Sequence, residues 1–396
     1  MKKYDAIIIG GGVIGSSVGY YLTKAGLKVA LVEKGDIAYG TSSGSDGNVL
    51  IHDKKPGFDT DLAYVSQQLF KKLNKDLDRD FEYTQKGSMF IIESEQEWDV
   101  AKDYVDRQVK DGYPMRMLDY DQVHKREPYL ADDIIGGVEI DCDASINPME
   151  FSYALCHSAQ EKGLDIYDHI AVKDVLLDSN KSVKSVLLAN GEKLSTENII
   201  NCAGVWAPKI GKMVGINIPI KPRQGQLLVA EKTFPVGERK IVEFGYMMAK
   251  FGDENYKRDV DPKLEEMGIA FVFEPTQSNN FLIGSSRNFS GFDTSVSIDV
   301  MKGLAQRAVR FFPIMKDINV IRAYAGLRPY VPDHFPIISE VESIPGYYIA
   351  AGHEGDGIGL SPITGKIISK KIVGENIDLQ SEIELNFDKL SFNRFN

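Results

Sequence analysis

The chain has 396 residues, of which 43% are hydrophobic and 26% are charged. This length and composition predict two or three ordinary globular domains and exclude a mainly disordered chain, a fibrous repeat and a polytopic membrane protein. The formal net charge of −11 gives little electrostatic support for a nucleic-acid partner.

The first 33 residues predict a βαβ unit. An apolar, β-branched strand over 4–9 is followed by a helix over 13–25, which Gly26 ends, and by a second strand over 28–33. The uncharged stretch 6–23 follows two lysines, as in a signal peptide or a single membrane span. Its five glycines and its lack of a cleavage motif favour the strand, turn and helix instead, so we expect no membrane span.

The turn of this unit carries the pattern G-x-G-x-x-G at Gly10, Gly12 and Gly15. The three glycines permit a tight turn, a close approach of the backbone to a pyrophosphate and close packing of helix on strand. Glu33 ends the second strand, where a carboxylate accepts hydrogen bonds from ribose hydroxyls. The alternative is a tight turn followed by a solvated surface glutamate. Because all four features are in register, we predict a dinucleotide site.

Further elements follow in chain order. The periodicity predicts helices over 62–77, 95–123, 148–163, 301–312 and 362–373, and strands up to residue 188, over 198–204, within 219–283 and over 347–351. The charged insertion 253–266 predicts a surface loop or lid. Elements typical of nucleotide binding at both ends of the chain predict a discontinuous first domain.

Three cysteines, Cys142, Cys156 and Cys202, lie far apart and form no CxxC pair. We therefore expect no metal and no iron–sulfur cluster held by this chain alone. Such sparse cysteine usage is typical of a reducing compartment, and we expect a cytoplasmic protein.

Two small-residue loops favour FAD over NAD. The loop 41–48 (TSSGSDGN) is able to pass close to a phosphate or a flavin ring. The loop 352–359 (GHEGDGIG) precedes the last helix, and amides at a helix N-terminus favour negative charge. A flavin develops negative charge when it accepts a hydride, whereas nicotinamide does not. The alternative for the second loop is a simple linker.

With these motifs the chain resembles the D-amino-acid oxidase family of FAD-dependent oxidoreductases, which includes glycine oxidase and the sarcosine oxidase β subunit. The matching segments, in family order, are 10–15, Glu33, 41–48, 201–206 (NCAGVW), 326–329 (GLRP) and 352–359. The segments 53–57, 284–287 with 291–293, and 352–357 look closer to the branch of multi-subunit amino-acid dehydrogenases. That branch contains the flavin subunit of hydrogen cyanide synthase, opine oxidase, and the proline and hydroxyproline dehydrogenase β subunits.

The resemblance implies an α/β fold (α+β overall), in which a doubly wound FAD-binding domain accompanies a mixed antiparallel-sheet substrate domain. We expect the FAD-binding domain to be discontinuous, over 1–85, 145–215 and 335–396, and the substrate domain to cover 86–144 and 216–334. FAD is expected to bind non-covalently, because the loop 352–359 has no cysteine for a thioether link.

Carried over by position, the resemblance implies FAD contacts in addition to Gly10, Gly12 and Gly15. They are Val13, Ile14, Glu33, Lys34, Thr41, Ser42, Asp46, Gly47, Asn48, Val172, Gly352, His353, Glu354, Gly355, Asp356, Gly357, Ile358 and Gly359.

Four residues are candidates for substrate binding or catalysis. Arg328 matches the arginine that holds a substrate carboxylate, and its planar fork suits that task; the alternative is a surface ion pair. Tyr246 matches a tyrosine that closes over the ligand, or it packs in a sheet. His52 and His353 lie in loops predicted near the flavin, and for each the functional and the structural interpretation stay open.

The implied reaction is oxidation of an amino or imino acid, of the proline, hydroxyproline, sarcosine or glycine type, to the imine by hydride transfer to flavin N5. Electrons are expected to pass to a partner subunit or carrier. The alternatives are a stand-alone oxidase that releases hydrogen peroxide and a non-catalytic flavoprotein. The sequence shows no convincing Asp–His or Lys base, and none is needed if the amine binds unprotonated.

Overall fold

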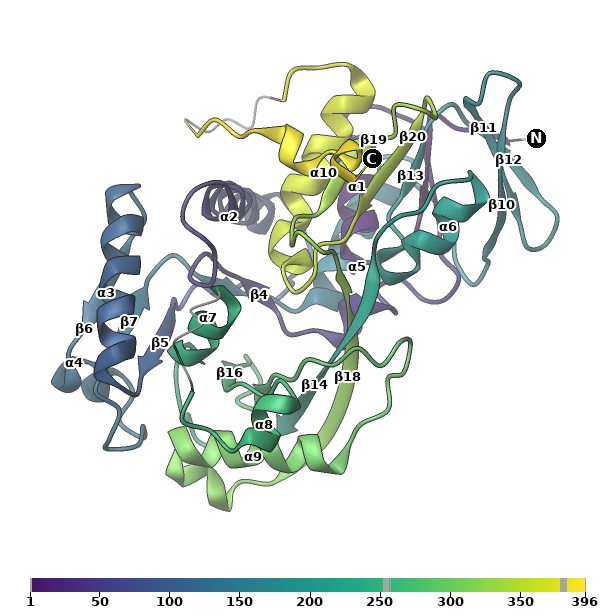
Figure 1. Ribbon diagram of the computed structural model, residues 1–396. Helices are drawn as coiled ribbons and strands as arrows, with labels where there is room; N and C mark the ends of the chain where they lie inside the picture. Colours follow the sequence, from purple (N-terminus) through teal and green to yellow (C-terminus); the bar gives the residue numbers. More distant parts are fainter. Residues whose placement is uncertain (1, 252–255, 257, 378–382, 396) are drawn as a thin grey trace.

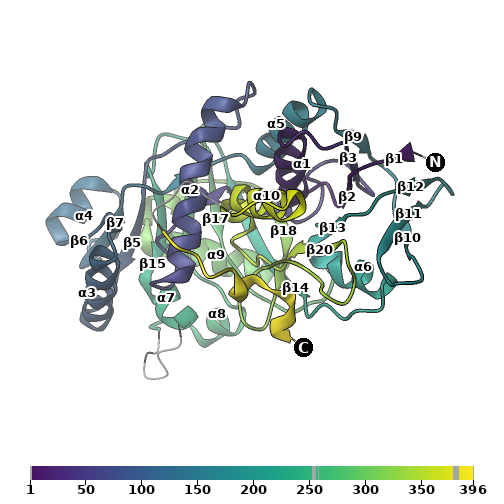
Figure 2. The same cartoon turned by 90° about the horizontal axis from the view of Figure 1, so that it is seen from above.

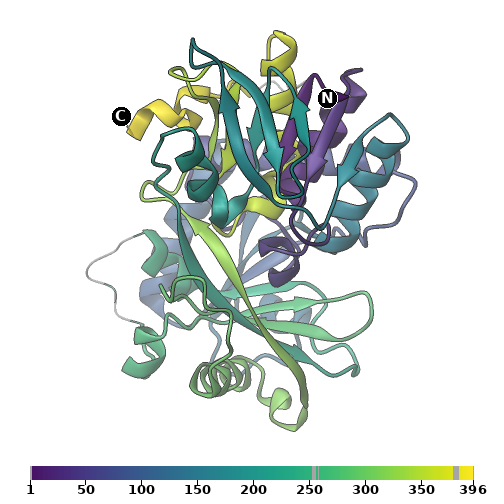
Figure 3. The same ribbon diagram turned by 90° about the vertical axis from the view of Figure 1, so that its right-hand side faces the viewer.

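A computed structural model describes residues 2–251, 256, 258–377 and 383–395 of the chain. It consists of two halves, with a six-stranded and a four-stranded sheet in one and an eight-stranded sheet in the other (Figure 1). Two long strands, β14 (Lys221–Ala230) and β18 (Val320–Tyr330), run from one half into the other (Figure 3). The expected α/β class, with a doubly wound sheet and a mixed antiparallel sheet, is confirmed.

The six-stranded sheet has five parallel strands and one antiparallel edge strand. Its order is β19 (Ile337–Glu340), β20 (Tyr347–Ala351), β13 (Ile199–Asn201), β2 (Ala6–Ile9), β3 (Val29–Val32) and β9 (Asp165–Tyr167). The chain leaves β2 for β3 on one side and later adds β13 on the other side. Such a reversal of strand order opens a crevice at the carboxyl ends of the two central strands.

Both faces of this sheet are covered, which explains why β2 and β3 are apolar at every position. Ala6 and Ile8 belong to the core shared with helices α1 (Val13–Lys24) and α10 (Gly357–Val373). Ile7 and Ile9 belong to a second core. Helix α1 contacts both α10 and α5 (Pro148–Gln160), and α2 (Phe58–Asp76) contacts α10 (Figure 2).

The second core lies against the four-stranded sheet and α6 (Ala207–Met213). That sheet contains β1 (Lys2–Lys3), β12 (Lys193–Ser195), β11 (Val183–Leu188) and β10 (Val172–Leu177). A separate two-stranded pair, β4 (Asn48–Val49) with β8 (Ala144–Ser145), follows the loop 41–47.

The eight-stranded sheet forms the other half. Its order is β18, β14, β17 (Phe281–Gly284), β16 (Val272–Pro275), β15 (Lys240–Glu243), β5 (Ser88–Ile92), β7 (Gly136–Ile140) and β6 (Met115–Leu118). Helix α9 (Ile298–Phe311) covers the face that points away from the first half (Figure 1), and its Leu304 and Phe311 share a core with Leu228 and Ile283. All eight strands fall within 86–144 and 216–334; the division into two domains with those bounds stays a prediction.

The predicted helical region 95–123 is wrong in its middle. Helix α3 (Glu95–Lys110) ends before Gly112, whose φ of +90° is left-handed. The chain then forms β6, in which Met115 and Leu118 pair with β7, and α4 (Tyr120–Arg126) begins with a capping box at Asp119. Pairing with a distant strand overrides the local helical pattern here.

The last helix begins earlier than predicted. Helix α10 starts at Gly357 rather than at Pro362, so part of the predicted loop 352–359 is helical. Proline has no N–H to give to the carbonyl of Ile358. The Ser361 hydroxyl donates to that carbonyl instead, at 2.8 Å, and the helix continues through the proline.

The region 219–283 also contains two helices that the strand-rich prediction lacks, α7 (Phe244–Phe251) and α8 (Pro262–Glu266). The predicted loop or lid at 253–266 lies partly outside the described residues. Two of its described side chains are anchored on acids of the eight-stranded half: Tyr256 donates to Glu97, and Arg258 pairs with Glu243 and donates to the carbonyl of Ile269.

None of the helices in the described part of the chain combines the length and the apolar character that crossing a membrane requires.

Candidate functional site

A cavity opens at the carboxyl ends of β2, β3, β13 and β20, beside the reversal of strand order. It continues to β14 and β18, so both halves of the molecule form its walls. Sixteen of the predicted FAD contacts line it: Gly10, Gly12, Val13, Ile14, Glu33, Lys34, Thr41, Ser42, Asp46, Val172, Gly352, His353, Glu354, Gly355, Gly357 and Ile358. Arg328 lines it as well.

Five predicted FAD contacts lie outside this lining, namely Gly15, Gly47, Asn48, Asp356 and Gly359. Gly15 packs beneath the turn, where an added Cβ would lie 1.9 Å from the Gly10 carbonyl oxygen. An added Cβ at Gly47 would lie 1.8 Å from the carbonyl oxygen of Ile146. These glycines therefore allow close backbone packing around the cavity.

The N-terminus of α1 forms one end of the cavity. Gly10 has φ +112°, and an added Cβ would lie 2.6 Å from the Cys202 carbonyl oxygen, so only glycine fits. Helix α1 has no side-chain cap at Gly12 and no acid in its first turn. Apart from the Val13 amide, its first-turn amides are therefore left for an anion. Ser42 accepts from the Val13 amide at 3.0 Å and closes the site from the side.

Glu33 shapes the same turn. One carboxylate oxygen accepts from the Gly11 amide at 2.7 Å, and the other accepts from the Gly35 amide at 2.9 Å. Each oxygen keeps a further lone pair for a ribose hydroxyl. Glu33 thus fixes the glycine turn in addition to its predicted role.

Lys34 and Trp206 follow along the wall. The Lys34 ammonium lies 3.5 Å from the centre of the Trp206 ring, and burial lowers the pKa of Lys34. The ring also stacks on Phe292, with the centroids 5.9 Å apart. Trp206 therefore contributes to the cavity wall as well as to packing.

The N-terminus of α10 forms another wall. It has no side-chain cap and no acid in its first helical turn. Gly352 has φ +83°, and an added Cβ would lie 2.5 Å from Val331. Asp356, just before the helix, pairs with buried Lys54 at 2.5 Å. Burial works against the charge of Lys54, but Asp356 and Asp53 outweigh it and raise the pKa of Lys54.

Two uncapped helix N-termini and a carboxylate at the expected ribose position thus face one cavity. This arrangement fits FAD: the α1 amides and Ser42 would hold the pyrophosphate, and Glu33 the ribose. The α10 amides favour the negative charge that a reduced flavin carries.

The loop 41–48 joins the two halves. Gly44 lies against Gly326 of β18 so closely that a Cβ on Gly326 would be 2.1 Å from the Gly44 carbonyl oxygen. The Thr41 hydroxyl donates to the Leu327 carbonyl at 2.8 Å. The loop therefore fixes β18, and with it Arg328, against the nucleotide-binding sheet.

A buried lysine, Lys240, holds the end of this loop. It pairs with Asp46 at 3.2 Å and with Glu274 at 3.0 Å, and it donates to Asn48. Glu274 also accepts from the Gly47 amide at 2.9 Å. Burial opposes the charge of Asp46, but Lys240 and Arg328 outweigh it and lower the pKa of Asp46. The side chains of Asp46 and Asn48 are therefore engaged with the protein.

Arg328 is held from behind by two serines. Its guanidinium donates to the Ser286 carbonyl at 3.0 Å and to the Ser285 hydroxyl at 2.7 Å. The guanidinium also lies over Gly225, where an added Cβ would be 2.1 Å from Nη1. Burial lowers the pKa of Arg328, and no Asp or Glu in the described ranges forms an ion pair with it. The predicted alternative of a surface ion pair does not describe this side chain.

Arg223 lies directly opposite Arg328 in the β14–β18 register. Unlike Arg328, it has a carboxylate partner, Glu354, at 2.9 Å. Glu354 has a left-handed φ of +50° and also contacts His334 at 3.0 Å. Such a conformation is unfavourable for glutamate and persists where the surroundings fix it.

His353 lines the cavity as a neutral imidazole. Burial lowers its pKa to about 3. Its Nε2 lies 2.9 Å from the Thr364 hydroxyl, which itself donates to the Leu360 carbonyl. The hydroxyl therefore accepts, and the proton of His353 is on Nε2.

His52 is buried outside the lining of this cavity. Its Nδ1 lies 2.9 Å from Asp143 and 2.9 Å from the Ser88 hydroxyl. Asp143 also accepts from the Ile51 amide at 2.7 Å and from Gln67 at 2.8 Å. The sequence did not indicate this Asp–His pair, because its members are 91 residues apart.

Tyr246 lies on α7, also outside this lining, and its ring faces the guanidinium of Arg287 at 4.2 Å. The roles of Tyr246 and His52 in binding stay predictions.

Sequence reasoning missed Lys240, Glu274 and Asp143. Each is a buried charge whose partners lie at least 34 residues away. The only indication in the sequence is that each of these charged residues lies within an apolar strand or turn.

Comparison with known proteins supports an FAD cofactor. The model of the family described as FAD dependent oxidoreductase (DAO) matches residues 5–371. Among curated relatives, hydrogen cyanide synthase subunit HcnC of Pseudomonas protegens is 29% identical over 96% of this chain and 94% of that protein. Glycine oxidase of Geobacillus kaustophilus is 27% identical over 98% and 96%, respectively.

Solved structures show the same fold. Glycine oxidase from Geobacillus kaustophilus superposes with a TM-score of 0.85 at 24% identity and covers 100% of this chain and 99% of its own. L-proline dehydrogenase from P. horikoshii gives a TM-score of 0.86 at 22% identity, with 100% and 98% covered. With the family match over most of its length and this shared fold, the chain belongs to the DAO family of FAD-dependent oxidoreductases.

Proposed function

We propose that this protein oxidises the C–N bond of an amino or imino acid to the imine, with electrons passing to a partner subunit or carrier. The observation that carries this proposal is Arg328, a half-buried guanidinium in the cavity wall that forms no ion pair with a carboxylate of the described chain. An unpaired buried charge is costly, and a bidentate carboxylate is the ligand that compensates it best.

Arg328 has five N–H donors, of which Ser285 and Ser286 use two. The remaining donors would bind the substrate carboxylate and so place the adjacent carbon and nitrogen. Bound FAD supplies the hydride acceptor. We infer that the residues named above hold it non-covalently.

Among the described residues that line the cavity, no carboxylate is free to act as a base. The three carboxylates that line the cavity are engaged: Glu33 with backbone amides, Asp46 with Lys240 and Glu354 with Arg223. His353 donates from Nε2, and its low pKa keeps it neutral. The amine would therefore bind unprotonated. We propose a substrate of the proline, hydroxyproline, sarcosine or glycine type.

The names of two relatives support a partner subunit or carrier as the electron acceptor. Both are named as parts of multi-chain enzymes, one of hydrogen cyanide synthase and the other of opine oxidase. The second candidate is a stand-alone oxidase that releases peroxide, and the glycine oxidases among the relatives favour it. We further infer a cytoplasmic protein, because all three cysteines are buried and unpaired.

The test is anaerobic bleaching of the flavin absorbance by a panel of amino and imino acids, with glycerol 3-phosphate as a substrate of another class. We expect bleaching by an amino or imino acid, followed by rapid reoxidation with an artificial dye and slow reoxidation with oxygen. Fast stoichiometric peroxide formation would support the oxidase. Bleaching by glycerol 3-phosphate alone would refute C–N oxidation.

A further inference from the structure

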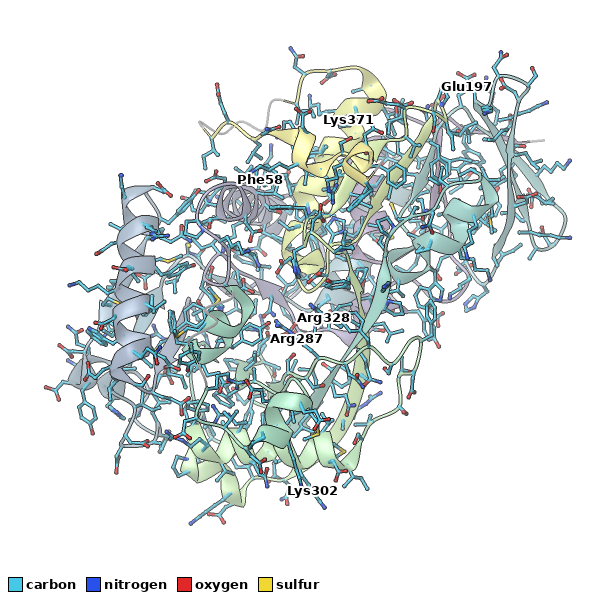
Figure 4. The ribbon with its side chains drawn as sticks, viewed as in Figure 1. Phe58, Glu197, Arg287, Lys302, Arg328 and Lys371 are labelled. Atoms are coloured by element: carbon cyan, nitrogen blue, oxygen red, sulfur yellow. The ribbon has the colours of Figure 1, made fainter. Side chains whose placement is uncertain are left out.

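A second arginine, Arg287, lies near enough to Arg328 for the two charges to interact, although it is not among the residues that line the cavity. Arg287 follows β17, and its neighbour Asn288 is tied to Gln224 of β14 by two backbone hydrogen bonds of 2.8 and 3.0 Å. Arg223 and Arg328 are register partners on β14 and β18. Arg287 and Arg328 are labelled near each other, between the two halves of the molecule, in the view of Figure 4, and the charge of Arg328 acts on the pKa of Arg287.

The three arginines differ in their partners. Glu354 neutralises Arg223 at 2.9 Å. Arg287, like Arg328, forms no ion pair with any carboxylate in the ranges that the structure describes, and its buried Nε has no hydrogen-bond partner. Its guanidinium lies 4.2 Å from the centre of the Tyr246 ring, a contact that orients a cation but does not neutralise it.

Close packing of the backbone at Gly268 constrains the position of Arg287. At Gly268, which has φ +60°, an added Cβ would lie 2.8 Å from the Arg287 carbonyl oxygen and 3.0 Å from its Cβ. The chain thus comes close to Arg287 on one side, while Tyr246 covers another. Burial together with the charges of Arg328 and Arg223 lowers the pKa of Arg287 to about 9, which leaves it charged at neutral pH.

We propose that Arg287 binds a second carboxylate of the substrate, so that the preferred substrate is an amino or imino acid with two carboxylate groups. This inference rests on the proposed function and narrows its substrate class. Two neighbouring cations that form no ion pair with an acid of the described chain repel each other, and a ligand with two negative charges relieves both. A ligand with one carboxylate compensates only one of them.

The two guanidinium groups are also anchored separately. Arg328 is held by Ser285 and Ser286 over Gly225, whereas Arg287 is held against Tyr246. Separate anchors favour two carboxylate subsites over one carboxylate shared by both side chains.

The binding test uses the FAD-loaded protein and matched acids. Malonate, succinate and glutarate are compared with acetate, propionate and butyrate, by perturbation of the flavin spectrum and by thermal shift. We expect at least one dicarboxylate to bind ten-fold or more tightly than its monocarboxylate. Arg287→Gln should remove this difference by a 10- to 100-fold loss of dicarboxylate affinity and leave monocarboxylate affinity nearly unchanged. Arg287→Lys should restore part of it.

Three results would overturn the proposal. Equal losses for mono- and dicarboxylates in Arg287→Gln would mean that both arginines share one carboxylate. No change for either class in a folded variant would make Arg287 structural. Tighter binding of inorganic phosphate than of any dicarboxylate would assign the second position to a phosphate.

A turnover test uses sarcosine and iminodiacetate, which share the same secondary amine and differ by one carboxylate. We expect faster flavin reduction by iminodiacetate at low concentration, and loss of that preference in Arg287→Gln. If sarcosine is preferred, the two-carboxylate inference fails and the proposed function stands. If no amine reduces the flavin, the proposed function fails, and the acid titration still decides whether Arg287 binds an anion.

Discussion

Replacing Arg328 by alanine tests the proposed function most directly. The substitution removes the hydrogen bonds to Ser285 and Ser286, at 2.7 and 3.0 Å, and it also removes a half-buried charge that forms no ion pair in the described chain. The lost hydrogen bonds lower the free energy of unfolding by about 1 kcal/mol each, and loss of the unpaired charge offsets this. We therefore expect a folded protein that retains FAD.

Substrate binding should suffer much more. A charge-assisted contact to a carboxylate contributes about 1.5–3 kcal/mol, and each ~1.4 kcal/mol is a factor of ten. Because up to three N–H groups of Arg328 are left for the substrate, kcat/KM should fall by about ten- to a hundred-fold or more. Arg328→Lys keeps a charge without the planar fork and should lie between the two.

Two further variants separate geometry from charge. Gly225→Ala places a Cβ 2.1 Å from Nη1 of Arg328, so the guanidinium must move although its charge stays. We expect this variant to lose kcat/KM, as Arg328→Lys does. Arg322→Ala is the matched control, because Arg322 lies on the same strand with an exposed side chain. It should leave the kinetics unchanged.

The assay is the rate of anaerobic flavin reduction as a function of substrate concentration in each variant. If Arg328→Ala saturates at the same concentrations and the same limiting rate as the unmodified protein, Arg328 does not bind the substrate. A loss in Arg322→Ala as large as that in Arg328→Ala would show that the effect comes from general destabilisation of β18.

Two further predictions concern the side-chain carboxyl groups of Glu33 and Glu93. Glu33→Ala removes the acceptor of the Gly11 and Gly35 amides, so FAD should be retained less well, as measured by FAD released on dialysis; undiminished retention contradicts this role. Burial raises the pKa of Glu93 to about 7 in the folded protein, against 4.5 ordinarily. The free energy of unfolding should therefore fall as pH rises from 4.5 to 7, by up to on the order of 3 kcal/mol from this group. In Glu93→Gln the difference in unfolding temperature between about pH 5 and about pH 8 should shrink, and an unchanged difference rules out this assignment.

The elements that the sequence predicted well are those whose signals are local. The βαβ unit is continuous in sequence, and its glycines act on residues a few positions away, as Gly15 does on the Gly10 carbonyl. The strand before the glycine pattern and the helix after it therefore needed no knowledge of the rest of the chain.

Errors arose where a distant partner decides the conformation. Residues 115–118 carry a helical pattern, yet they pair with β7 and form a strand. The sequence alone does not distinguish three buried charged residues from ordinary surface charges, because only the fold brings them next to their partners. They are Lys240, Glu274 and Asp143. Side-chain pairing depends on tertiary position, and one sequence contains no direct signal for it.

The same limit applies to Arg328, because the sequence alone does not show whether this arginine has an acid partner. The motif GLRP located this arginine near the substrate by resemblance, but only the structure distinguishes it from Arg223, its register partner on the next strand. The two side chains come from register partners on neighbouring strands, and one carboxylate, Glu354, forms an ion pair with Arg223 but not with Arg328. Glu354 has a left-handed backbone and pairs with Arg223 and His334, whereas no ion pair joins Arg328 or Arg287 to an acid in the described chain. The distribution of acids around these arginines, rather than the arginines themselves, therefore determines which of them can bind an anionic substrate.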